Sequence, residues 1–238
     1  MKKISYQLPL LLSFLFLFTS CEPRNIVDVE ENPVPQGISI FSNDWGEGEI
    51  IDGNNITAFS ESFNSYTIAA TSGGNLLRQK NIGYSWIVYE TLSDPVTIIH
   101  RSSNGFIYGT TQSGQLYNSN TNGRTWTLLK GFNREINSIL TANDNSIFIG
   151  TSSGLYRSDD EGENWSVVNT GIPEAVRIFS ILVTGEGILF AGSSEGLYKS
   201  SDNGITWNKT GFNEICFVLA QGYKSDLFAG TSNGVFRS

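Results

Sequence analysis

Short apolar runs and polar turns alternate along most of the chain. Runs such as IFIGT from Ile147 and LFAGS from Leu189 lead through a glycine-containing turn into a second run, GLYRS or GLYKS. A polar turn follows, and then a third run that opens with tryptophan; a fourth run, such as INSIL, precedes the first. β-Rich runs bounded by turn residues predict four short strands in each unit. Outside the N-terminal segment no stretch shows the 3.6-residue apolar period of a helix, so the chain is predicted to be all-β.

This pattern repeats about every 40 residues. Tryptophans mark the repeat at spacings of 41, 40, 39 and 42 residues: Trp45, Trp86, Trp126, Trp165 and Trp207. Four-stranded units with such a period are typical of β-propeller blades. A two-layer β-sandwich is the structural alternative, but it does not explain the period. The sequence therefore predicts a five-bladed β-propeller of four-stranded blades over residues 38–238.

The two ends of the repeat array complement one another. The last unit, from Leu227, stops before its tryptophan strand, whereas Trp45 lacks the strands that should precede it. We therefore expect residues 45–51 to supply the outer strand of the last blade, which would close the ring and cover an open sheet edge. The alternative is that the chain is a piece of a longer array.

Two of the polar turns share the pattern S-x-D-x-G-x-x-W. In such a turn the aspartate can accept hydrogen bonds from nearby backbone N–H groups, the glycine supplies a positive φ, and the tryptophan buries a large ring. These side chains are therefore predicted to be structural rather than catalytic. They are Ser158, Asp160, Gly162 and Trp165 in one turn, and Ser200, Asp202, Gly204 and Trp207 in the other.

These turns resemble the Asp-box of BNR-type β-propellers, which occur in sialidases, sortilin-like receptors, some endoglucanases and photosystem-assembly factors. The resemblance covers about 170 residues, although two further turns have Thr121 and Asn81 at the aspartate position. It implies the propeller fold and places the box turns on the face away from the usual ligand site. The string GTSSGLYRS is also similar, more weakly, to the repeat of sensor-type two-component-regulator propellers.

The N-terminus has the pattern of an export signal. Lys2 and Lys3 precede an apolar run at residues 10–18 that is too short to span a bilayer and suits a secretory signal. The string FTSC resembles a bacterial lipoprotein processing site, which implies that residues 1–20 are removed and that Cys21 carries lipid. An ordinary signal peptide with an incidental cysteine is the alternative. Residues 21–37, with three prolines and several acids, are predicted to be a flexible tether.

Charge and composition exclude several classes of function. The net charge of −8 becomes −10 once Lys2 and Lys3 are removed, which argues against a nucleic-acid partner. Two cysteines and a single histidine exclude a cysteine-based zinc site and a paired-histidine metal motif. We expect no metal and no cofactor. Cys216 is expected to be a small buried hydrophobe and His100 a hydrogen-bonded strand residue.

The loop after each tryptophan strand carries an acid and suggests a binding face. The acids recur at intervals of 42, 41, 39 and 40 residues: Asp52, Asp94, Glu135, Glu174 and Glu214. Such loops gather around the channel of a propeller, where five carboxylates would attract a cation, a basic peptide or sugar hydroxyls. The alternative, which we favour, is that they are turn residues copied with the repeat. Phe132 and Phe212, in the same loops, either stack on a ligand or, as we prefer, pack the loop against its blade.

No catalytic residues are predicted. The closest string to the F/Y-R-I-P segment of sialidases is VRIFS, around Arg177, and no nucleophile motif or phosphate loop appears. We expect a non-catalytic, monomeric lipoprotein of the bacterial envelope, anchored at Cys21, whose propeller binds or scaffolds a protein or glycan partner. The alternatives are a small glycoside hydrolase of sialidase or glucanase type, and a sensor or assembly-factor propeller that works with a partner.

Overall fold

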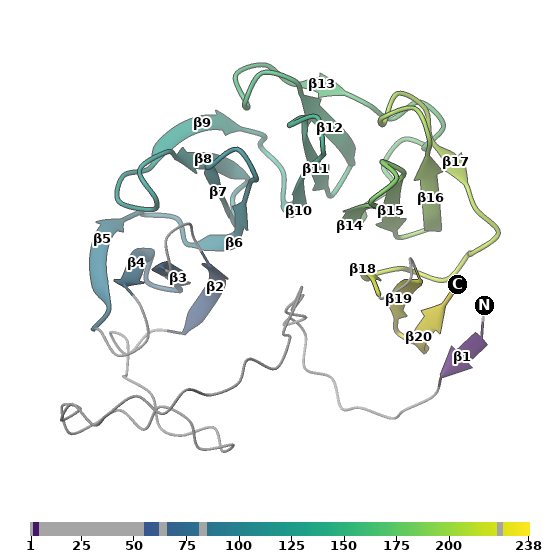
Figure 1. Ribbon diagram of the computed structural model, residues 1–238. Helices are drawn as coiled ribbons and strands as arrows, with labels where there is room; N and C mark the ends of the chain where they lie inside the picture. The colour runs from purple at the N-terminus through teal and green to yellow at the C-terminus, as the bar shows by residue number, and fades with distance from the viewer. Residues whose placement is uncertain (1, 5–54, 62–65, 81–84, 223–225) are drawn as a thin grey trace.

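The chain forms five antiparallel sheets arranged one after another around an arc (Figure 1). The computed structural model describes residues 2–4, 55–61, 66–80, 85–222 and 226–238. All regular structure in these residues is β-strand, and each sheet has four strands. Over the same residues, no helix has the length and apolar character needed to cross a bilayer. The predicted all-β propeller with five four-stranded blades is confirmed.

Each of the first four sheets runs from an innermost to an outermost strand in chain order. The first consists of β2 (Ile56–Glu61), β3 (Tyr66–Thr71), β4 (Asn75–Lys80) and β5 (Ile87–Thr91). The second consists of β6 (Val96–Arg101), β7 (Ile107–Thr111), β8 (Gln115–Ser119) and β9 (Thr127–Gly131). The third consists of β10 (Ile136–Thr141), β11 (Ile147–Thr151), β12 (Gly154–Ser158) and β13 (Ser166–Val167). The fourth consists of β14 (Ile178–Val183), β15 (Leu189–Ser193), β16 (Gly196–Ser200) and β17 (Asn208–Lys209).

The last sheet is completed by a strand from the other end of the chain. It contains β18 (Val218–Gln221), β19 (Leu227–Thr231) and β20 (Gly234–Arg237), and β1 (Lys2–Ile4) pairs with β20. An N-terminal strand thus closes the last blade, as predicted, but it comes from within the predicted signal peptide. The segment expected there, residues 45–51, lies outside the described residues. A free sheet edge presents a row of N–H and C=O groups, so its pairing depends little on side chains.

The core consists of apolar layers between neighbouring sheets. Between the first two, Ile68 and Leu76 meet Ile107 and Trp126, and similar clusters separate each later pair. Each inner sheet is covered on both faces, so every position of β7, β11 and β15 is buried. This explains why the corresponding sequence runs are continuously apolar or small instead of alternating.

A β-bulge near the start of each of the first four inner strands turns one side chain along the arc. The register shifts lie between residues 56 and 58, 96 and 98, 136 and 138, and 178 and 180. The hydroxyl of the bulge residue Thr57 donates to the carbonyl of Val96 at 2.5 Å, and Asn137 Nδ2 donates to the carbonyl of Ile178 at 2.9 Å. These bonds tie β2 to β6 and β10 to β14.

His100 makes a further link between inner strands. Its Nε2 accepts a hydrogen bond from the backbone N–H of Thr141 at 3.1 Å and lies 3.0 Å from the Thr141 hydroxyl. This acceptor role requires the neutral ring, and burial lowers the pKa of His100 to about 4. The predicted hydrogen-bonded strand histidine is confirmed. Cys216 is fully buried, as expected, and burial raises the pKa of its thiol to about 12.

His100 is expected to make the fold sensitive to mild acid. Because its pKa is lower in the folded chain than the ordinary 6.5, its contribution is complete above pH 6.5 and is lost as the pH falls towards 4. The loss should reach roughly 2–3 kcal/mol in the free energy of unfolding. Urea unfolding from pH 7 to 4 should show this slope, His100→Gln should flatten it, and Thr141→Val should retain it. An unchanged slope in His100→Gln would contradict the assignment.

Candidate functional site

The connections between strands form two opposite faces, because consecutive antiparallel strands alternate in direction. One face holds the connections from each outermost strand to the next sheet and the hairpins between second and third strands. We call it the loop face: residues 72–74, 92–95, 112–114, 132–135, 152–153, 168–177, 194–195, 210–217 and 232–233. The other, the turn face, holds the remaining hairpins and the S-x-D-x-G-x-x-W turns.

In the third sheet the polar turn is closed by its own side chains. Asp160 accepts hydrogen bonds from the Ser158 hydroxyl at 2.8 Å and from the backbone N–H of Asn164 at 2.8 Å. The Ser158 hydroxyl accepts from the N–H of Gly162 at 2.9 Å, and Trp165 Nε1 donates to the Gly162 carbonyl at 2.8 Å. Gly162 has a φ of 97°, in the left-handed region that favours glycine. The turn therefore holds its aspartate in a structural role.

The fourth sheet repeats this geometry. Asp202 accepts from the Ser200 hydroxyl at 2.7 Å and from the N–H and hydroxyl of Thr206 at 2.9 and 2.5 Å. These bonds, led by the one from the Thr206 hydroxyl, lower the pKa of Asp202 to about 2. Gly204 donates to Ser200, and Trp207 is 2% exposed. In the second sheet Thr121 replaces the aspartate and still accepts from the N–H of Thr125 at 2.9 Å.

On the loop face the four described acids lie apart, each in its own surroundings. Asp94 accepts from the Ser113 hydroxyl at 2.5 Å, Glu135 pairs with Arg177 at 3.1 Å, and Glu214 accepts from Asn233 at 2.6 Å. Glu174 is exposed, and Asp52 lies outside the described residues. Within the part of the chain that the structure describes, no three His, Cys, Asp or Glu side chains are grouped to hold a metal ion.

The equal spacing of these acids in the sequence does not give them equivalent positions. Asp94 comes two residues before its inner strand, Glu135 one residue before and Glu174 four residues before. The connection to β14 is longer than those to β6 and β10, so Glu174 is displaced along its loop. The structure therefore places the acids on one face without bringing them to a common point.

Phe132 and Phe212 are buried, with 7% and 9% of their surface exposed. Phe132 packs edge-on against Tyr156 and Trp165, with ring centroids 5.1 and 5.2 Å apart, and Phe212 packs edge-on against Phe236 at 5.1 Å. Both rings therefore hold their loops against the blades, which is the packing role that the sequence suggested for them. This burial agrees with the preferred interpretation and leaves neither ring free to stack on a ligand.

Two other phenylalanines, the half-buried Phe179 and the exposed Phe217, form an aromatic pair at the inner edge of the loop face. Phe179 occupies the bulge of β14, and its ring lies 5.1 Å from that of Phe217, at 55° to it. Phe217 is 45% exposed and its neighbours Ile215 and Val218 are 41% and 37% exposed. The guanidinium of Arg177 lies 5.9 Å from the centre of the Phe179 ring. We call Ile215, Phe217, Val218 and Phe179 the aromatic rim.

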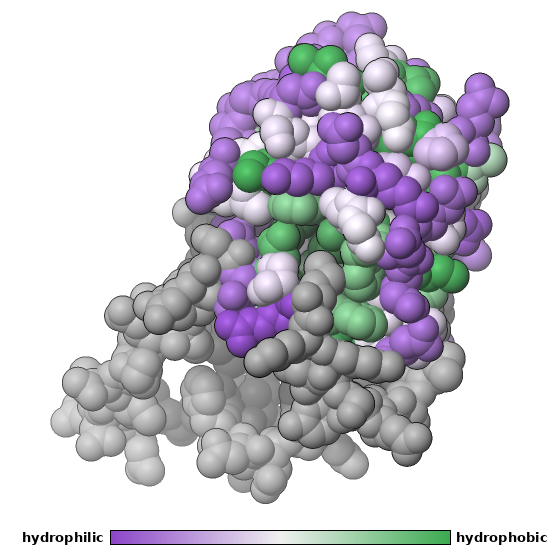
Figure 2. All heavy atoms as spheres, turned by 90° about the vertical axis from the view of Figure 1, so that its right-hand side faces the viewer, coloured by the Kyte–Doolittle hydropathy of each residue, from purple (hydrophilic) through white to green (hydrophobic). Residues whose placement is uncertain are grey.

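This rim is not among the residues predicted from the sequence, although the repeats contain a signal for it. Once the units are aligned on their inner strands, one position is polar in the first three sheets and aromatic in the last two. The residues at that position are Thr57, Thr97, Asn137, Phe179 and Phe217. Figure 2 views the outer side of the last two sheets, away from the inner edge where the rim lies, and shows a separate patch of apolar surface between polar margins.

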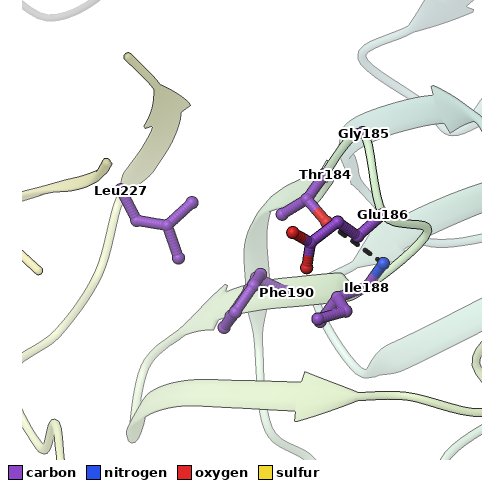
Figure 3. A pocket seen from close by; sticks show the side chains of 6 residues that line it. All are labelled: Thr184, Gly185, Glu186, Ile188, Phe190 and Leu227. Atoms are coloured by element: carbon purple, nitrogen blue, oxygen red, sulfur yellow. Dashed lines mark hydrogen bonds between the residues drawn. The ribbon is translucent and has the colours of Figure 1, made fainter. Parts of the chain in front are cut away.

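A small cavity lies on the turn face between the fourth and last sheets (Figure 3). It encloses about 170 Å³ and is lined largely by apolar surface. Ile188 and Phe190 come from the fourth sheet and Leu227 from β19, while Glu186 supplies a carboxylate at the margin. A single carboxylate beside apolar walls provides no acid–base pair.

The fold defines the molecule as a β-propeller protein. A model of the DUF6242 beta propeller domain matches residues 142–238, which cover most of the last three sheets. Among curated proteins, none matches the sequence.

Solved structures of other propellers share the fold at low identity. The extracellular domain of the putative one component system BT4673 from B. thetaiotaomicron superposes with a TM-score of 0.66 and 16% identity over 82% of this chain. This chain spans 28% of that protein's length. The structure of YCF48 bound to D1 peptide gives 0.64 and 13% identity, over 82% of this chain and 68% of that one. A putative gluconolactonase gives 0.57 and 13%, over 79% and 75%.

The turn around Asp202 is expected to lose stability in strong acid. The pKa of Asp202 lies below its ordinary value of 3.8, so its contribution is complete above about pH 4 and is lost as the pH falls towards 2. Asp202→Asn should lower the melting temperature at pH 7 and reduce the acid dependence between pH 4 and 2. Glu163→Gln, at an exposed position of the neighbouring sheet's turn, is the matched control and should melt like the parent protein. Equal melting of both variants would contradict the role of Asp202.

Proposed function

We propose that this protein is a non-catalytic binding protein of the bacterial envelope, and that its propeller binds a protein partner at the loop face. The observation that carries the proposal is the aromatic rim, in which three exposed apolar side chains and the half-buried Phe179 lie on a face where loops are held by rigid sheets. Exposed apolar surface with a polar margin is typical of interaction sites. A rigid scaffold with exposed loops is a common way to present such a site.

The structural comparisons support a binding role. One similar structure is YCF48 bound to D1 peptide, and two others are extracellular domains of a putative one component system and a putative hybrid two component system from B. thetaiotaomicron. Three of the loop-face acids, Asp94, Glu135 and Glu214, hydrogen-bond or pair with local side chains. Such engagement suits a shaped binding surface better than a pair of free catalytic carboxylates.

An envelope location is part of the proposal. Residues 1–20 would act as a lipoprotein signal, Cys21 would carry the lipid, and residues 21–37 would hold the propeller away from the membrane. Removal of residues 1–20 would take β1 away from the edge of β20 and leave that edge for another strand. The proposed relation to Asp-box propellers is supported by the bonds around Asp160 and Asp202.

Site-specific photo-crosslinking tests which face binds the partner. A benzophenone amino acid at Glu174, which is exposed on the loop face, should crosslink to a protein in the native bacterium. The same group at Glu163, which is exposed on the turn face, is the matched control and should give no such product. Equal crosslinking from both positions, or capture of glycan alone from Glu174, would overturn the proposal.

Lipid anchoring has a separate test. Cys21→Ala should move the protein from the membrane fraction to the soluble fraction, because the acyl chains supply most of its membrane affinity. Cys216→Ala removes the other cysteine, which is buried, and should leave the protein in the membrane fraction. Fractionation of cells followed by immunoblotting measures both. If Cys21→Ala remains in the membrane fraction, the anchor has been assigned incorrectly.

A further inference from the structure

A series of side-chain contacts between inner strands runs along the arc and ends at the last sheet. In the first and third sheets the bulge side chain reaches the next inner strand: Thr57 donates to the carbonyl of Val96 and Asn137 to that of Ile178, whereas Thr97 of the second sheet donates to Thr110 of its own sheet. In the fourth sheet the bulge residue Phe179 reaches the ring of Phe217. Phe217 directly precedes β18, the innermost strand of the last sheet, at the end of the arc. Almost half of its surface is exposed. The aromatic rim therefore lies where this series of contacts between inner strands ends.

The residue types at this end differ from those in the third sheet. When the inner strands are aligned by their pairing, Ile215, Phe217 and Val218 occupy the positions that Glu135, Asn137 and Ser138 occupy in the third sheet. These three positions, polar in the third sheet, are thus apolar here, with side chains that are 37–45% exposed. The Phe217 position is also polar in the first two sheets, where Thr57 and Thr97 occupy it. Exposing apolar side chains at polar positions gives nothing to the fold, so a bound partner explains them best.

The charges around the rim indicate what kind of partner fits. Arg177 is paired with Glu135 at 3.1 Å, which neutralises the positive charge beside Phe179. Glu214, just before Ile215, and Glu174, in the loop that leads to β14, leave the surroundings negative. The whole chain has a net charge of −8, so a second copy would be repelled. These charges favour a cationic partner over a copy of this chain.

The shape of the rim favours a side chain over a sugar ring. The rings of Phe179 and Phe217 are tilted by 55° and so do not offer a common plane for stacking. Ile215 and Val218 add aliphatic surface beside them. An angular apolar surface of this kind suits a leucine or phenylalanine side chain.

We propose that the aromatic rim binds an apolar side chain of a protein segment in which lysine or arginine residues flank that side chain. This inference rests on the proposed function and names the chemistry of its partner. The apolar side chain would pack against Phe217 and Phe179, and the flanking cations would lie near Glu174 and Glu214. Binding therefore depends on the apolar residue and weakens as salt screens the charges.

Synthetic peptides test the proposal directly. Three sets of fluorescent 12-residue peptides share a serine–glycine background: a central leucine or phenylalanine flanked by lysines, the same centre flanked by glutamates, and a serine centre flanked by lysines. Fluorescence anisotropy with the full-length protein should show binding of the first set alone, weakened by added salt. Equal binding of the second or third set would overturn the proposal, as would no binding of the first.

Variants then locate the site. Phe217→Ser should weaken binding of the first set at least about tenfold, as expected for loss of an anchor residue. Ile215→Ser provides a second variant in the same rim, and Val167→Ser, at a 60% exposed position on β13, is the matched control. Circular dichroism melts check that each variant is folded. Unchanged binding in a folded Phe217→Ser and Ile215→Ser, or competition by oligosaccharides in place of peptides, would overturn the proposal.

The outcome for the rim can be separated from that for the loop face. If Glu174 crosslinks to a protein in cells while Phe217→Ser leaves that crosslink and peptide binding unchanged, the loop-face function stands and the rim assignment fails. If Glu174 gives no crosslink to a protein and the peptides do not bind, both fail.

Discussion

The packing of each sheet against a neighbour on both of its faces is the constraint on which the structure depends. It buries every residue of β7, β11 and β15 and places large rings such as Trp207 between the layers. Burial of this kind stabilises by roughly 1.5–3 kcal/mol for each large apolar side chain. A sheet with two apolar faces cannot be stable alone, so the units fold as an array in which each covers the next.

Polar side chains at the outer and inner edges of the sheets add hydrogen bonds to this apolar packing. At the outer edge, Asp160 and Asp202 close the turns that bring the tryptophans into the layers. At the inner edge, the bulge residues and His100 bond one sheet to the next. Most of these groups are committed to the fold, whereas Ile215 and Phe217, in the connection to the last inner strand, remain exposed.

The contrast between Phe212 and Phe217 shows how position in the array decides a role. Both are phenylalanines in the connection that leads to β18, five residues apart. Phe212 lies over Phe236 of the same sheet and is buried, whereas Phe217 extends past the inner edge and stays exposed. An aromatic residue in a loop can contact a partner only where the sheets leave it uncovered. Whether it is covered cannot be read from the loop sequence alone.

The sequence by itself determined the all-β class, the period, the four strands of each unit and the structural turns, because these depend on local patterns of apolar, glycine and aspartate residues. It also indicated that an N-terminal strand completes the last sheet, since the last unit lacks one. Only the tertiary structure decided which side chains are exposed: it separated the loop-face acids, buried Phe132 and exposed Phe217. Exposure depends on what the neighbouring sheet covers, and that neighbour lies about 40 residues away in the chain.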